Sequence, residues 1–136
     1  MAVQIDANKQ LMDRYRKALE SEDMQALTAL QTESLADDYV QEWPQSGERI
    51  RRDNAIKINE QYTQATGNTP KMKVRRIITK DDLAIVEGTL DYGDGTPVSY
   101  VGITELRDGK VARNTEYFAN PFEAPEWRKQ YVERMG

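Results

Sequence analysis

The second half of the sequence holds a run of four predicted β-strands, and this run restricts the fold more than any other feature. The strands span residues 71–79, 83–92, 98–106 and 110–118. Short polar or glycine-containing stretches separate them, namely Asp81-Asp82, Gly93-Asp94-Gly95 and Arg107-Asp108-Gly109. The last of these is typical of a tight hairpin turn, so we expect antiparallel pairing along the run.

The first half of the sequence predicts three helices and one strand. From Asn8 the apolar side chains recur at helical spacing on one stripe, formed by Leu11, Tyr15, Ala18 and Leu19. Ser21 together with Glu22 and Asp23 is predicted to start a short second helix, and Asp53 to cap a third that ends at Gly67-Asn68-Thr69-Pro70. Residues 35–43 change to a period of two, which predicts a strand. The charged residues 48–52 are predicted to form a solvated loop, and the alternative is that they hold an anionic ligand.

Helices followed by hairpins indicate an α+β domain, in which amphipathic helices cover a curved sheet. With 136 residues the chain is predicted to form a single domain, 1–136. After the last strand, Pro125 introduces a terminal helical turn with Trp127 and Tyr131 on one face. We expect this tail to pack on the domain or on a second subunit.

Composition excludes several classes of function. Cysteine and histidine are absent, so acid–base chemistry falls to Asp, Glu, Tyr or Lys. The net charge is −4 without a basic stripe, which argues against nucleic acid as a partner. Neither a signal sequence nor a run of ~20 apolar residues is present, which predicts a cytoplasmic protein without membrane contact. The acidic pairs Asp37-Asp38 and Asp81-Asp82 lack further ligands at suitable spacing, so no metal or other cofactor is predicted.

The last strand places a carboxylate between an amide and a phenyl ring. Alternation puts Asn114, Glu116 and Phe118 on one face of this strand. If that face is buried, Glu116 lies in a mostly apolar hollow. The alternative is that Glu116 faces solvent and pairs with Arg113 or another basic neighbour.

Two stretches, WPQSGERIRRDNAI and LRDGKVARNTEYFANPFEAPEWRKQYVE, together with the order of elements, resemble the nuclear transport factor 2-like superfamily and specifically its SnoaL-like domains. The resemblance implies a cone-shaped domain. In such a cone three helices of the N-terminal half pack in a strongly curved, mostly antiparallel sheet, and a short helix follows at the C-terminus. It also implies a pocket at the open end of the cone that binds a small hydrophobic molecule.

The resemblance further implies which side chains face this pocket. The apolar lining is expected to be Val40, Val86, Leu90 and Phe118. The polar groups are expected to be Tyr15, Tyr100, Asn114, Glu42 and Glu116. By the resemblance, the catalytic acid of the epoxide hydrolases falls on Glu116 and their pocket amide falls on Glu42. The Arg and Asp that the epoxide-hydrolase pattern also requires fall on Gly88 and Leu90. Their absence weakens the epoxide-hydrolase interpretation.

Two carboxylates in one apolar hollow cannot both ionise cheaply, so one of them is expected to hold a proton near neutral pH. Glu116 is then expected to take a proton from substrate or water, while Glu42 or Tyr100 donates to a developing oxyanion and Asn114 orients the ligand. This predicts an isomerase, cyclase, dehydratase or hydrolase acting on a hydrophobic substrate. The alternative is a ligand-binding or accessory domain without turnover.

The opposite face of the last two strands predicts a homodimer. It is expected to hold Val101, Ile103, Val111, Thr115 and Tyr117. This patch is too apolar to remain exposed on a chain as polar as this one. Burial against a second copy across a two-fold axis would remove it from water.

Overall fold

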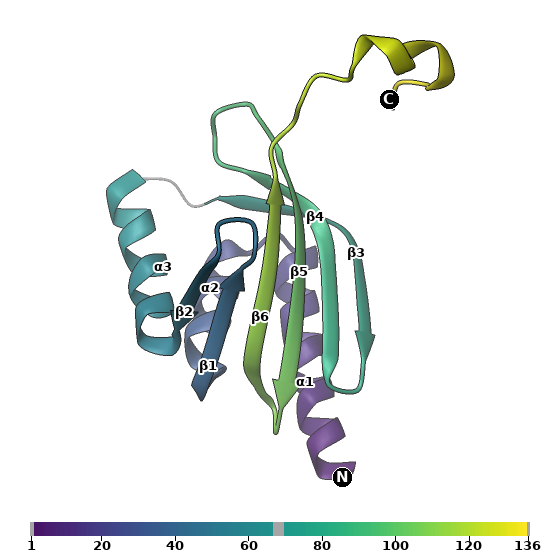
Figure 1. Cartoon of the computed structure of the whole chain (residues 1–136). Helices are drawn as coiled ribbons and strands as arrows, with labels where there is room; N and C mark the ends of the chain where they lie inside the picture. Colours follow the sequence, from purple (N-terminus) through teal and green to yellow (C-terminus); the bar gives the residue numbers. More distant parts are fainter. Residues whose placement is uncertain (1, 67–69, 136) are drawn as a thin grey trace.

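The structure, a computed structural model, describes residues 2–66 and 70–135, and the side chains of residues 6–61 and 70–135. In this part of the chain a six-stranded sheet curls beside its helices (Figure 1). The helices are α1 (Ala2–Glu20), α2 (Met24–Glu33), α3 (Arg52–Thr66) and the short 3-10 helix η1 (Glu126–Tyr131). The strands are β1 (Leu35–Trp43), β2 (Glu48–Arg51), β3 (Lys71–Lys80), β4 (Leu83–Asp91), β5 (Val98–Arg107) and β6 (Lys110–Ala119). The predicted α+β class is confirmed.

The strands lie in the order β2-β1-β6-β5-β4-β3. All neighbours are antiparallel except β1 and β6, which run parallel, so the meander from β3 to β6 has the predicted pairing. The prediction of a loop at residues 48–52 is wrong, because residues 48–51 form strand β2 beside β1. An edge strand keeps its charged side chains in solvent, and in β2 only Ile50 is buried.

The hairpin between β5 and β6 ties the sheet to the first helix. Asp108 and Gly109 have φ angles of 55° and 75°, as a two-residue hairpin turn requires. The backbone N–H of Gly109 donates to Oδ1 of Asn8 at 2.8 Å, and Asn8 is buried in α1. This contact fixes α1 against the base of the meander.

Irregular pairing bends the sheet and changes which side chains face inward. Glu105 of β5 pairs with Arg113 of β6, but the next residue, Leu106, pairs with Val111. Ala112 of β6 is therefore an extra residue in the ladder. A bulge of this kind reverses the alternation beyond it. Val111 was predicted on the outer face, but it is only 1% exposed and belongs to the core.

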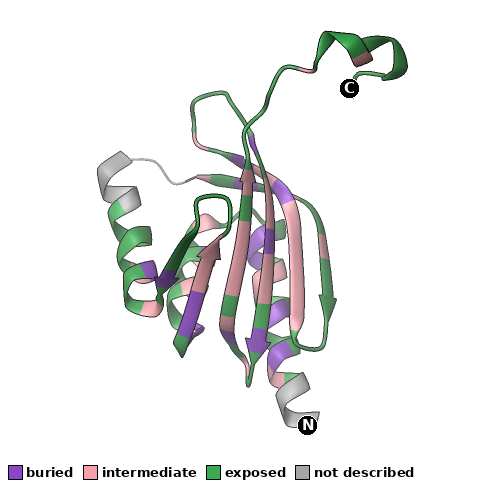
Figure 2. Ribbon diagram, viewed as in Figure 1, coloured by how far each residue is buried: buried purple, intermediate pink, exposed green. Residues whose placement is uncertain are grey.

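The core lies between the inner face of the sheet and the helices (Figure 2). Leu11, Ala18 and Leu19 of the predicted α1 stripe are buried, and Tyr15 packs against them. The predicted break at 67–69 lies outside the described residues. In the described part of the chain, no helix is both long and apolar enough to cross a membrane.

The C-terminal tail projects away from the sheet (Figure 1). Pro125 precedes η1 as predicted, but Trp127 and Tyr131 are 71% and 76% exposed. The tail therefore does not pack on its own domain, and packing on a second subunit stays a prediction.

The outer face of the sheet carries exposed apolar side chains. Ile78 and Tyr117 are 51% and 41% exposed, and the neighbouring Val101 and Ile103 are partly exposed. A hollow of about 610 Å³ on this side is lined in part by Val101, Tyr117 and Ala119. The tail leaves the sheet directly after Ala119, which is part of the lining of this hollow.

We expect a homodimer in solution, because the outer patch and the tail expose more apolar surface than a monomer of this polarity tolerates. Truncation after Asn120, or replacement of Trp127 and Tyr131 by alanine, should weaken the dimer. Replacing the polar tail residues Lys129 and Gln130 by alanine is the matched control. Sedimentation equilibrium measures the mass, and a wild-type species of 15.6 kDa at micromolar concentration would contradict the expectation.

Candidate active site and ligand pocket

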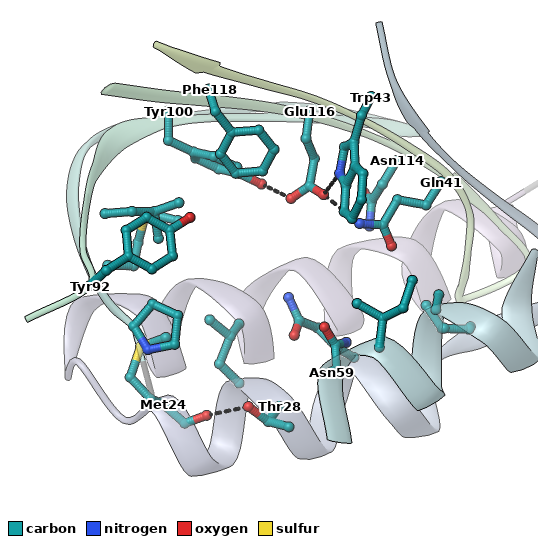
Figure 3. A pocket seen from close by; sticks show the side chains of 18 of the residues that line it. Met24, Thr28, Gln41, Trp43, Asn59, Tyr92, Tyr100, Asn114, Glu116 and Phe118 are labelled. Carbon is teal, nitrogen blue, oxygen red and sulfur yellow. Dashed lines mark hydrogen bonds between the residues drawn. The ribbon is translucent and has the colours of Figure 1, made fainter. Parts of the chain in front are cut away.

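A hollow of about 530 Å³ lies between the inner face of the sheet and the helices α2 and α3 (Figure 3). Much of its wall is apolar, with contributions from Leu27, Leu35, Ala55, Met72 and Leu90. Five aromatic side chains of the described residues also line it, namely Tyr39, Trp43, Tyr92, Tyr100 and Phe118. A hollow of this volume and character is typical of a small-molecule site.

Glu116 of β6 points into this hollow and is the centre of its polar contacts (Figure 3). Its Oε1 accepts hydrogen bonds from Gln41 Nε2 at 2.6 Å and from Trp43 Nε1 at 2.9 Å. Its Oε2 accepts from the Tyr100 hydroxyl at 2.5 Å. All three partners are donors, which matches an ionised carboxylate that can only accept. Of the two alternatives for Glu116, the structure therefore shows the pocket position.

Strand β1 supplies two of these donors because it runs beside β6 in a fixed register. Gln41 pairs with Asn114 in this parallel ladder, and alternation then turns Tyr39, Gln41 and Trp43 inward. The Tyr39 hydroxyl donates to Gln41 Oε1 at 3.1 Å and accepts from Asn114 Nδ2 at 2.9 Å. The Gln41 carbonyl is thereby engaged by Tyr39, which leaves the amide nitrogen to donate to Glu116.

The prediction that Glu42 shares the hollow with Glu116 is wrong. Glu42 lies on the other face of β1, where its Oε1 meets Arg113 Nη1 at 2.7 Å and its Oε2 meets Arg49 Nη2 at 3.3 Å. Val40 lies on the same face, buried but absent from the described lining. The physical reason is that the face with Tyr39 and Trp43 offers far more apolar area to bury than a face with two acids.

That contrast between the two faces of β1 is present in the sequence, and it is the signal that could have identified Gln41 and Trp43. The family resemblance instead places the pocket amide of the epoxide hydrolases on Glu42, and this led to the prediction that Glu42 faces inward. The paired-acid arrangement has no basis in this structure, because only one of the two carboxylates lines the hollow.

Tyr100 reaches Glu116 because the residue between them in the sheet has no side chain. Gly102 pairs with Glu116 across β5 and β6, and a Cβ at Gly102 would collide with the Tyr100 hydroxyl. Burial raises the pKa of Tyr100 well above its usual value, and the negative charge and hydrogen bond of Glu116 raise it further. The hydroxyl therefore stays protonated and available as a donor near neutral pH.

The remaining predicted residues divide between two connected spaces. Leu90, Asn114 and Phe118 line the main hollow. Tyr15 and Val86 line a smaller hollow of about 80 Å³, which shares Leu27, Gln31, Met72, Tyr100, Asn114 and Glu116 with the main one. The Tyr15 hydroxyl lies 2.8 Å from Ser34 Oγ, so its contact is with the end of α2. The roles assigned to all of these residues stay predictions.

In the described part of the chain, no cluster of three or more acidic side chains is placed to hold a metal ion. The carboxylate of Glu116 is surrounded by amide, indole and phenol donors rather than by further carboxylates.

The fold is that of nuclear transport factor 2-like proteins. A nuclear transport factor 2-like protein of unknown function from Burkholderia xenovorans is 33% identical, with a TM-score of 0.71 over 98% of this chain and 99% of its own. A Kribbella flavida protein proposed to be a ketosteroid isomerase is 26% identical, with a TM-score of 0.74 over 100% and 95% of the two chains. An LEH-like epoxide hydrolase from M. tuberculosis is 23% identical, with a TM-score of 0.56 over 83% of each chain.

The SnoaL-like domain family matches residues 12–114, so the chain belongs to this family. The resemblance inferred from the two sequence stretches is confirmed. No curated protein matches the chain.

We expect Gly102→Ala to break the contact between Tyr100 and Glu116, because the added methyl group occupies the place of the Tyr100 hydroxyl. Carbon-detected NMR of the Glu116 carboxyl should then show the change in chemical shift that Tyr100→Phe produces. Ser99→Ala, on the opposite face of the same strand, is the control. An unchanged Glu116 signal in the Gly102 variant would contradict this account.

The buried tyrosines predict a loss of stability at high pH. Burial raises the pKa of Tyr15 to about 12, and it also raises the pKa values of Tyr39 and Tyr100. The folded state thus holds these protons more tightly than the unfolded state, whose tyrosines titrate near ~10. Their contribution is fully present below that pH and is lost as the pH rises towards the folded-state values.

Urea unfolding between pH 9 and 11.5 should show the free energy of unfolding falling by up to about 1.4 kcal/mol per pH unit for each such tyrosine. Tyr15→Phe should reduce this slope, whereas Tyr131→Phe on the exposed tail is the control. A slope that is the same in wild type and the Tyr15 variant would overturn the explanation.

Proposed function

We propose that this protein binds a small, largely apolar molecule in the main hollow and acts on it by acid–base chemistry at Glu116 and Tyr100. One observation supports this most directly: Glu116 is the only charged residue in the described lining, and the Tyr100 hydroxyl lies 2.5 Å from it. The similarity to a protein proposed to be a ketosteroid isomerase supports a small-molecule reaction.

In this proposal Glu116 takes a proton from the substrate or from a water molecule. Gln41 and Trp43 hold the carboxylate in one orientation, which keeps the base in place before the ligand arrives. Tyr100, whose raised pKa keeps its proton in place, donates a hydrogen bond to an oxygen that becomes negative during the reaction. Asn114 orients the ligand from the same strand as Glu116. This assignment needs one carboxylate and one phenol. The position of Glu42 on the other face of β1 therefore does not affect it.

The second candidate function is ligand binding without turnover. It is favoured by the three donors on Glu116, because both carboxylate oxygens already accept hydrogen bonds and a proton from a ligand has to compete with these donors. The two candidates differ in what Glu116 does after a ligand binds.

Glu116→Gln should lower turnover of a panel of unsaturated ketones, which includes a steroid and a ketone that carries a substituted ammonium group, by about 10² to 10⁴-fold, since a positioned base is worth that much. Tyr100→Phe should also lower kcat by removing the donor. Glu42→Gln makes the same chemical change on the other face of the sheet and should leave turnover unchanged. Initial rates give kcat and KM for each variant, and circular dichroism checks that each is folded.

Equal losses in Glu116→Gln and Glu42→Gln would contradict the site assignment. If the wild type binds members of the panel in this hollow and converts none of them, binding without turnover is the better function. If nothing from the panel occupies the hollow, both candidates lose their support.

A further inference from the structure

The described lining of the main hollow carries a negative charge and no positive charge. Of the 21 described residues that line it, Glu116 is the only acid and none is Lys or Arg. The segment 62–69, whose side chains are not described, contains no Asp, Glu, Lys or Arg in its sequence. Glu116 therefore has neutral partners but no ion-pair partner in this space.

Aromatic rings lie around this single charge. The Trp43 indole donates directly to Glu116, and its ring meets Phe118 edge-on at 6.3 Å between centroids. Phe118 in turn lies 5.4 Å from the ring of Tyr100, which also donates to Glu116 (Figure 3). Tyr39 and Tyr92 add two further rings to the wall of the same hollow.

A ligand that fills this hollow removes water from the carboxylate. A neutral ligand leaves the charge with its three donors alone, and the lost solvation counts against binding. A ligand with its own positive charge replaces the lost water by a direct attraction, which is strong in a space of low polarity. Aromatic ring faces attract the same ligand, because their quadrupoles favour cations.

We infer that the ligand recognised by this hollow is an organic cation, a molecule with a substituted ammonium group that lies against Glu116 and the neighbouring aromatic rings. The inference rests on the proposed small-molecule function of the same site and names the chemical class of its ligand. A bare metal ion fits less well, because calcium takes six or more oxygen ligands and the described lining offers one carboxylate.

Arg16 is the basic residue in the described lining of the smaller hollow, which Glu116 also lines. Its Nη2 lies 3.4 Å from Thr79 Oγ1 on the side of α1. Among the described residues, Arg16 and Glu116 form no ion pair. Arg16 does not line the main hollow, which is the larger of the two.

The test compares choline with 3,3-dimethylbutan-1-ol, which has the same shape but a neutral carbon in place of the charged nitrogen. Dissociation constants come from NMR titration, with pocket signals identifying the site. In wild type, choline should bind at least about tenfold more tightly than the alcohol, since an aromatic and carboxylate site is worth more than 1.4 kcal/mol to a desolvated cation. In Glu116→Gln this ratio should fall to near one.

Two further variants keep the test decisive if the Glu116 variant folds poorly. Trp43→Leu should weaken choline binding more than alcohol binding, because it removes a ring and keeps apolar bulk. Glu105→Gln removes one negative charge from the exposed outer face and should leave the ratio unchanged. Intrinsic fluorescence of Trp43 in a Trp127→Phe background gives an independent reading of the hollow.

Equal affinity for the two probes in wild type would overturn the cation inference and leave the proposed function standing. A preference for choline that survives in Glu116→Gln, or choline signals that map outside the hollow, would also overturn it. If neither probe binds in the hollow at millimolar concentration, the inference is contradicted, and the turnover panel then decides the proposed function separately.

Discussion

A carboxylate inside an apolar fold has to be supplied with hydrogen-bond donors, and much of this structure can be traced to that requirement at Glu116. Removal of a charge from water is costly unless partners replace the lost solvation. Here the partners come from two other strands: Gln41 and Trp43 from β1, and Tyr100 from β5. The parallel pairing of β1 with β6 places the first two, and the missing side chain at Gly102 lets the third reach across.

The donors are themselves held by their surroundings. Thr104 donates to the Asn114 carbonyl at 2.6 Å, Asn114 donates to Tyr39, and Tyr39 donates to Gln41, which donates to Glu116. Each step fixes the orientation of the next group, since an amide whose oxygen is engaged can offer only its nitrogen. On the opposite face, Glu42 is engaged with Arg49 and Arg113, so the two acids of neighbouring strands are kept in separate environments.

Most of the fold could be predicted from the sequence, because it depends on local patterns. The turn at Asp108-Gly109 and the alternation of the last four strands specify the meander within one residue at each strand end. The inward face of β6 at Glu116 was predictable for the same reason. The errors occur where contacts between distant parts of the chain decide which side chains face inward. The inward face of β1 depends on its pairing with β6, and the position of Val111 depends on a bulge at Ala112. Strand β2 was missed because an edge strand needs little apolar surface of its own.

The three donors that hold Glu116 also restrict how its carboxylate can react. They occupy both carboxylate oxygens, so a proton from a substrate has to compete with a donor for its place. In the proposed reaction the substrate therefore displaces one of the donors. Tyr100 is the donor most suited to displacement, because its hydroxyl hydrogen can rotate towards another acceptor, whereas the Gln41 amide is held by Tyr39 and the N–H of Trp43 is fixed in the plane of its ring. A substrate oxygen that takes the Tyr100 hydrogen bond would have its negative charge stabilised and would leave Glu116 Oε2 open to accept the proton. In the proposed mechanism the same hydroxyl therefore serves the carboxylate before the ligand enters and the ligand afterwards.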